Sequence, residues 1–279
     1  MGTSTSSTGP AGGVPLVPPW APPPPALLPD APPEETATEP PAPDEAPAAV
    51  DQPELGQAIV GRFGPARRAL GDYGRTGASD SLRRGVGNYV SKGYSGARTT
   101  SSRFSGTATT AGALANVLNS LAAEAPVQGL DRALLSTLDS DALLDSLVEA
   151  VRQVDGTQDA EAERKSTRDA LSDTLKKFPD DDPLVLSPEA RTYAIERFVA
   201  LDVFNRFVLD VGVAIQSAAP SPAQALARLA EARSYITQTV STAFRRLEKQ
   251  GHAVNTARIS RVVRTALRDA FEVFEEYAQ

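Results

Sequence analysis

The 279-residue chain contains no cysteine and a single histidine, His252. Without cysteine it can form no disulfide, no thiolate metal site and no cysteine nucleophile. One histidine cannot build a multi-histidine metal site and leaves little room for histidine-based catalysis. Because His252 follows Gly251, a residue type that ends helices, we expect it in a surface connection. The inventory predicts a protein that is not an enzyme and has no catalytic residue, no metal site and no cofactor bound by itself.

Long apolar runs are also missing. The most hydrophobic window, residues 198–215, is interrupted by Asp202, Arg206 and Asp210, so no stretch reaches the roughly 18 apolar residues of a membrane span. The first basic side chain is Arg62, and an N-terminus without positive charge does not fit a signal peptide. We therefore expect a cytoplasmic protein that does not contact a membrane.

Proline and charge are distributed unevenly along the chain. Residues 1–61 hold 16 of the 23 prolines and eight carboxylates, without one Lys or Arg. Residues 62–105 carry nine basic side chains against two aspartates, and residues 106–279 carry 19 basic against 25 acidic side chains, so the net charge of −7 hides segments of −8, +7 and −6. A stretch rich in proline and carboxylates buries too little apolar surface to offset its ordering entropy. We predict a disordered Pro-rich tail over 1–55, a basic Gly/Arg/Tyr-rich segment over 56–106 and a helical bundle over 107–279.

Apolar residues recur every three or four positions from Leu114 onward, a pattern typical of amphipathic helices. Ser187-Pro188-Glu189 and Ser221-Pro222-Ala223-Gln224 each place Ser at an N-cap and Pro at the first helical position. Long helices with short connections predict an all-α, antiparallel bundle. The expected elements are a helix with Leu114–Leu121 on one face, helical spacing through Leu130, Leu134 and Leu138, a stripe from Leu143 to Val154, a charged surface helix over 158–177, a central helix from 188 to Ile215, a helix carrying Leu226 to Leu247, and a last one carrying Ile259 to Tyr277.

The basic segment allows two interpretations. Residues 61–106 contain ten glycines, and because this density is poor for helices we expect irregular backbone with short helical pieces. The first interpretation is a loop-rich segment that packs on the helices or on an acidic partner. The second is nucleic-acid binding through phosphate neutralisation and base stacking. The candidate nucleic-acid or partner contacts are Arg67, Arg68, Arg83, Arg84, Tyr89, Tyr94, Arg98 and Arg103.

The first two residues form a candidate modification site. Met1-Gly2 is a good substrate pattern for removal of the initiator methionine, which would leave a glycine α-amine. Such an amine has a pKa of about 7.7–8.0, so part of it is neutral and nucleophilic at cytoplasmic pH. The alternatives are an ordinary start residue and, from Gly2 with Ser6, a myristoylation site. Five Lys against 23 Arg suggest a GC-rich bacterial genome, where myristoylation is not expected.

A short apolar patch, Leu16-Val17-Pro18-Pro19-Trp20, contains the chain's one tryptophan. It is either an ordinary Pro-rich stretch or a linear motif that docks in an apolar or aromatic-lined groove.

Three strings, MGTSTSSTGP, PLVPPWAPPPP and the basic run RFGPARRALGDYGRTG…GVGNYVSKGYSGARTTSSRFSGTATTAGALANVL, together resemble the QatB family, the B component of bacterial Qat anti-phage defence systems. The resemblance is strongest over residues 1–25 and 61–118, whereas the helical end fits the family only in general character. It implies a non-enzymatic component that works beside an ATPase, a QueC-like enzyme of the QatC type and a TatD-like nuclease.

The resemblance also implies a reaction for Gly2. QueC enzymes activate a carboxylated 7-deazaguanine with ATP so that an amine can attack it, and in related defence systems the amine is a protein's N-terminal glycine. We therefore expect this chain to be the substrate and binding partner of the QueC-like enzyme, which would use ATP and the 7-deazaguanine precursor. The alternative function is a nucleic-acid-binding adaptor that recruits the TatD-like nuclease. Besides Gly2, the expected contacts with the enzyme are Thr3, Ser4, Leu16, Pro18, Pro19 and Trp20.

Overall fold

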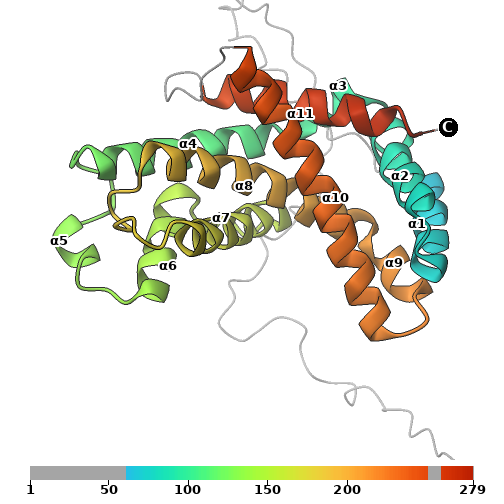
Figure 1. Ribbon diagram of the computed structural model, residues 1–279, viewed down its shortest axis with the longest axis horizontal. Helices are drawn as coiled ribbons and strands as arrows, with labels where there is room; N and C mark the ends of the chain where they lie inside the picture. Colours follow the sequence, from blue (N-terminus) through green and yellow to red (C-terminus); the bar gives the residue numbers. More distant parts are fainter. Residues whose placement is uncertain (1–60, 251–258, 279) are drawn as a thin grey trace, which may run out of the picture. The chain divides into compact units, whose positions relative to one another are not determined.

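The computed structural model describes residues 61–250 and 259–278 (Figure 1). The chain from Gly56 onward forms one compact unit. The described residues fold into α-helices and two short π-helical turns without a strand, which confirms the all-α class. The elements are α1 (Gly64–Thr76), α2 (Ser79–Asn88), η1 (Tyr89–Gly93), α3 (Ala97–Arg103), α4 (Ser105–Ala122), α5 (Arg132–Leu135), α6 (Ser140–Val151), α7 (Gln158–Lys177), α8 (Pro188–Phe207), η2 (Val208–Gly212), α9 (Val213–Ala218), α10 (Pro222–Lys249) and α11 (Ile259–Glu275).

Both start signals begin helices where the sequence places them. The Ser187 hydroxyl accepts a hydrogen bond from the Ala190 N–H at 3.2 Å, and Ser221 accepts from the Gln224 N–H at 3.2 Å. Each cap satisfies one of the backbone donors left free at a helix N-terminus. Each proline occupies the first helical position, where no N–H is needed.

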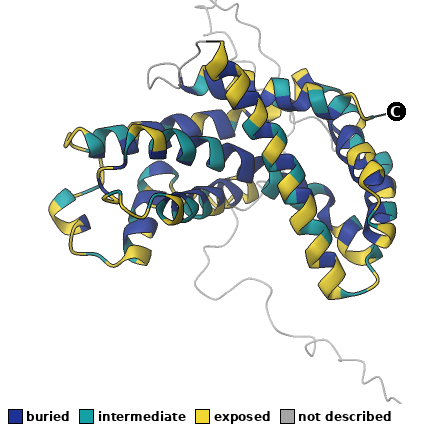
Figure 2. Cartoon of the chain, in the orientation of Figure 1, coloured by how far each residue is buried: buried dark blue, intermediate teal, exposed yellow. Residues whose placement is uncertain are grey.

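Helix α8 is the centre of the bundle, as predicted. It packs against α4, α7 and α10, and α10 in turn packs against α11 (Figure 1). Its buried residues lie on several sides of the helix (Figure 2). The predicted continuation to Ile215 is present, but a π-helical turn, η2, separates α8 from α9. None of the described helices combines the length and the apolar composition needed to cross a membrane.

From Gly64 onward the basic segment is mainly helical, so the prediction of irregular backbone is wrong, whereas the predicted short helical pieces are present. Gly77 and Gly96 lie at helix ends with positive φ, but other glycines lie where helices approach closely. A Cβ on Gly74 of α1 would lie 2.7 Å from the carbonyl oxygen of Ile215, and one on Gly87 of α2 would lie 2.6 Å from the backbone nitrogen of Ala278. The other part of that interpretation is confirmed, because α1 and α2 pack against α9 and α11.

Helix α7 is not a surface helix, which corrects a second expectation. One face is buried against α8 and consists of alanine, serine and threonine together with Glu163 and Leu171. A face of small and polar residues has the hydropathy of a solvated surface, but small side chains allow two helices to approach closely. The prediction of a surface helix was wrong because it depended on hydropathy alone.

The spacing of Leu130, Leu134 and Leu138 does not produce a long helix. Only the single turn α5 forms there, begun by Asp131, whose carboxylate accepts from the Ala133 and Leu134 N–H groups. Four apolar residues expected on buried stripes are exposed instead: Leu134, Val154, Leu226 and Tyr277.

Candidate functional site

The residues predicted to meet the QueC-like enzyme lie outside the described residues, as does His252. These are Gly2, Thr3, Ser4, Leu16, Pro18, Pro19 and Trp20. The described part of the chain contains the candidate contacts of the basic segment. It also contains three charged residues of α8 and η2, Asp202, Arg206 and Asp210.

The six candidate arginines all lie at the surface. Among the described residues, only Arg83 has a carboxylate within 4 Å, that of Asp80 at 3.6 Å. Arg67 donates instead to the backbone carbonyl of Asp210 at 3.0 Å. Unpaired guanidinium groups are free to neutralise phosphate or carboxylate. The structure thus exposes six arginines of α1, α2 and α3 that can each attract an anion: Arg67, Arg68, Arg83, Arg84, Arg98 and Arg103.

The two candidate tyrosines point inward. Tyr89 is 2% exposed, and its ring stacks on Phe63 and meets Phe207 edge-on, each at 5.4 Å between centroids. The Tyr89 and Tyr94 hydroxyls both donate to one carboxylate oxygen of Asp210, at 2.9 and 2.7 Å. Burial is the main cause that raises the pKa of both phenols, to about 12 for Tyr94, so both remain donors at neutral pH. Tyr89 therefore has no ring face to offer a nucleic-acid base.

Asp202, the first charged residue in the apolar window, is completely buried in α8. Its Oδ2 accepts from the Thr107 hydroxyl at 2.6 Å and from Arg206 Nε at 3.1 Å. Among the described residues, its Oδ1 has only the Ser166 hydroxyl as a neighbour, at 3.4 Å, and that hydroxyl donates to the Ala162 carbonyl at 2.6 Å. One oxygen of this carboxylate is therefore poorly satisfied.

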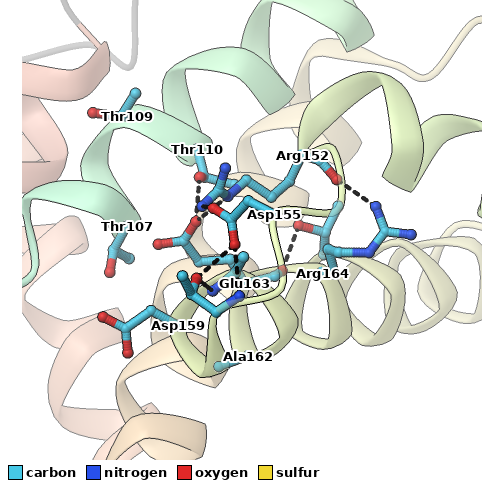
Figure 3. A network of polar contacts seen from close by, with 12 residues as sticks. Thr107, Thr109, Thr110, Arg152, Asp155, Asp159, Ala162, Glu163 and Arg164 are labelled. Carbon is cyan, nitrogen blue, oxygen red and sulfur yellow. Dashed lines mark hydrogen bonds and ion pairs between the residues drawn. The ribbon is translucent and has the colours of Figure 1, made fainter. Parts of the chain in front are cut away.

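Glu163 of α7 is the second buried carboxylate of the same network (Figure 3). It accepts from Arg206 Nη2 at 2.6 Å, from Arg152 Nε at 2.8 Å and from the Thr110 hydroxyl at 2.9 Å. Gly106 leaves room for this arrangement, because a Cβ there would lie 2.6 Å from Glu163 Oε1. The network thus joins α4, the segment after α6, α7 and α8.

Arg206 completes the network with a third partner, Asp159, at 3.0 Å from Nη1. Burial alone would lower the pKa of Arg206, but the charges of Asp202, Asp159 and Glu163 raise it. Burial raises the pKa of Asp202 to about 6 despite the opposing effects of Arg206 and Thr107. The guanidinium therefore stays charged, whereas Asp202 changes charge near pH 6.

A polar cleft of about 270 Å³ connects the Asp202 network with Asp210. The Arg62 guanidinium lies in it, 4.5 Å from the Phe63 ring centroid and 4.6 Å from that of Tyr94. The described side chains hold no group of three or more acidic or histidine residues arranged to bind a metal ion. The remaining lining residues are Tyr94, Arg103, Phe104, Gln158, Asp159, Arg206, Leu209 and Asp210.

Sequence reasoning missed these networks although a signal was present. Asp202, Arg206 and Asp210 are spaced by four residues in the most apolar part of the chain, so they share one helix face. Charges in such a window need partners when they are buried. The window was used only to exclude a membrane span.

Together the described residues define a helical protein whose interior contains paired charges and whose surface carries unpaired arginines. A family model described as Qat anti-phage system associated protein QatB matches residues 95–274. This match covers more than half of the chain, so the chain belongs to the QatB family and has a role in Qat anti-phage defence. Comparison with curated proteins and with solved structures gave no match.

The match lies mainly in the helices from α3 to α11. The expectation that the helical end fits the family only in general character is therefore corrected. The strings that first suggested the family overlap the matched region only over residues 95–118.

Proposed function

We propose that this chain is the protein substrate of a QueC-like enzyme of the same defence system, which conjugates a 7-deazaguanine group to the Gly2 amine. Family membership is the observation that supports the proposal most directly. In the reaction the Gly2 nitrogen attacks the ATP-activated carboxyl of the precursor, the activating group leaves, the amine loses a proton, and an amide forms. The enzyme and not this chain holds ATP and the precursor.

The chain's own contribution is an unhindered amine on a long Pro-rich segment. Glycine has no Cβ, and Thr3 and Ser4 are small, so the terminus fits a narrow pocket. Binding of the helical body to the enzyme would raise the local concentration of that amine. Leu16, Pro18, Pro19 and Trp20 supply a second, apolar contact under this proposal. No residue of this chain acts as a catalyst in it.

The test is the mass of the N-terminal peptide after co-expression with the QueC-like enzyme. We expect Gly2 without Met1 and with the mass of the conjugated group, whereas the Gly2→Ala protein stays unmodified and loses defence. Gly9→Ala is the matched control and retains both. An unmodified Gly2, or a Gly2→Ala protein that is conjugated normally, contradicts the proposal.

The exposed arginines support a second candidate function, an adaptor that brings the nuclease of the system to nucleic acid. Five of the six arginines have no carboxylate within 4 Å among the described residues, although Tyr89 cannot stack on a base. Neutralising Arg83, Arg84, Arg98 and Arg103 should abolish a salt-dependent shift of single-stranded DNA or RNA. Neutralising Lys176 and Lys249 is the control. No binding at low salt would refute this function.

A further inference from the structure

A cleft of about 350 Å³ lies between α10 and α11, with Arg83 of α2 among its lining residues. Its apolar lining is formed by Ala243, Ala270 and Val273. Its volume is near the lower end of small-molecule sites, which typically combine an apolar lining with a few convergent polar groups.

Three polar groups of this cleft make no hydrogen bond and no ion pair within 4 Å in the described part of the chain. The Tyr235 hydroxyl is buried without a hydrogen bond. The Asp269 carboxylate and the Arg246 guanidinium take part in none of the hydrogen bonds or ion pairs of this structure. Buried polar groups are normally paired, because an unmade hydrogen bond costs about 1–3 kcal/mol. The buried Tyr235 hydroxyl, with the half-buried Asp269 and the exposed Arg246 unpaired beside it, points to a ligand.

The fourth group, Arg83, is only weakly held. Its guanidinium lies 3.6 Å from the exposed Asp80 carboxylate and 5.6 Å from the centroid of the Tyr277 ring. An exposed ion pair of this kind contributes little energy. Arg83 is therefore available to an anion.

The cleft contains both hydrogen-bond donors and an acceptor. Burial raises the pKa of Tyr235 to about 12, with a further contribution from Tyr277, so the hydroxyl is a donor at neutral pH. Burial also raises the pKa of Asp269, and the charge of Glu272 raises it further. The charges of Arg246 and Arg268 lower this pKa. Glu272 itself is paired with Arg268 at 3.0 Å. The cleft thus offers two guanidinium groups, one hydroxyl donor and one carboxylate acceptor.

We propose that this cleft binds a nucleoside monophosphate whose base carries an exocyclic amine. Arg83 and Arg246 pair with the phosphate, because guanidinium groups form strong, geometrically matched contacts to phosphate oxygens. Asp269 accepts hydrogen bonds from the amine, and the Tyr235 hydroxyl donates to an acceptor of the ligand. The base lies on Ala243, Ala270 and Val273. This site is independent of Gly2 and of the conjugation proposed above.

The arrangement favours a free nucleotide over a nucleic-acid strand. A strand held by its phosphates would depend on Arg83 and Arg246 but not on Asp269. A free nucleotide with an amine would depend on all three. The dependence on Asp269 therefore distinguishes the two sources of phosphate.

Isothermal titration of the full chain with GMP, AMP, UMP and inorganic phosphate tests the proposal. We expect GMP and AMP to bind at least tenfold more tightly than UMP or phosphate. Arg246→Ala should weaken GMP binding at least tenfold, a loss of about 1.4 kcal/mol, and Asp269→Asn should reduce the preference for GMP over UMP. Tyr235→Phe should weaken binding several-fold.

Matched controls lie beside the tested residues. Arg245→Ala and Arg264→Ala remove exposed charges of the same two helices outside the cleft and should bind GMP like the parent protein. Circular dichroism and thermal melting verify that each variant is folded. The proposal is overturned if GMP does not bind at millimolar concentration or if phosphate binds as tightly as GMP. It is also overturned if both Arg246→Ala and Asp269→Asn bind GMP like the parent protein.

Discussion

Replacing Asp202 with asparagine tests whether burial or the ion pair with Arg206 dominates at the centre of the bundle. The change keeps the size of the side chain and removes its charge. Asparagine can still accept from Thr107 and Arg206 through its oxygen, and its amide can donate to Ser166, which the carboxylate contacts at 3.4 Å. The comparison therefore isolates the charge.

The size of the effect follows from the pKa of Asp202, raised by burial from 3.8 to about 6. Below about pH 4 the carboxyl is protonated in both the folded and the unfolded state. As pH rises from 4 to 6, the unfolded state loses its proton first, so the free energy of unfolding falls. Above pH 6 the full loss is about 3 kcal/mol, of which about half falls between pH 5 and 7.5.

The assay is urea unfolding of both proteins at several pH values, with the free energy of unfolding extrapolated to water. The difference between the parent protein and Asp202→Asn should move by about 1–2 kcal/mol in favour of the variant from pH 5 to 7.5. Asp159→Asn, which removes the exposed partner of the same arginine, should change stability by less than about 1 kcal/mol. If the parent protein instead becomes more stable relative to Asp202→Asn as pH rises, the ion pair outweighs burial and this reasoning is refuted.

Two further predictions concern the same interior. Arg206→Ala leaves Asp202 and Glu163 buried without their common partner, so it should lower the free energy of unfolding by about 3–5 kcal/mol. Arg268→Ala, which breaks an exposed pair, should cost less than about 1 kcal/mol; equal losses in urea unfolding would contradict this difference. Gly74→Ala places a methyl group 2.7 Å from the Ile215 carbonyl oxygen and should cost about 1–3 kcal/mol. In Gly64→Ala the methyl group meets no atom within 4 Å. A melting temperature that falls as much in Gly64→Ala as in Gly74→Ala would refute the packing argument.

The sequence predicted those helix starts and apolar faces that depend on residues within one or two helical turns. Ser187 and Ser221 begin α8 and α10 because a cap and a proline act within one turn of helix. The apolar stripe of α11 is buried from Ile259 to Phe274 for the same reason. These elements required no knowledge of their neighbours.

The failures over the basic segment and α7 involve a partner from elsewhere in the chain. Gly74 and Gly87 weaken an isolated helix, but they stabilise this fold by allowing contact with Ile215 and Ala278. Glu163 has the appearance of a surface residue until Arg206, 43 positions later, is placed beside it. Pairings of this kind depend on tertiary arrangement, which local periodicity does not encode.

The candidate site divides in the same way. The arginines of the basic segment were predicted as exposed contacts and are exposed. Tyr89 was grouped with them by composition, yet its ring fills the core beside Phe63 and Phe207. Composition places aromatic and basic residues in one segment but cannot separate the two sides of a helix.

The recognisable region of the chain is smaller than its folding unit. The family match begins at residue 95, but α1 and α2 cover α9 and α11 from outside that region. A protein shortened to the matched residues would uncover Phe207, Ile215 and the end of α11, and exposed apolar surface of this kind promotes aggregation. Expression boundaries for this family should therefore follow tertiary contacts and begin before Phe63.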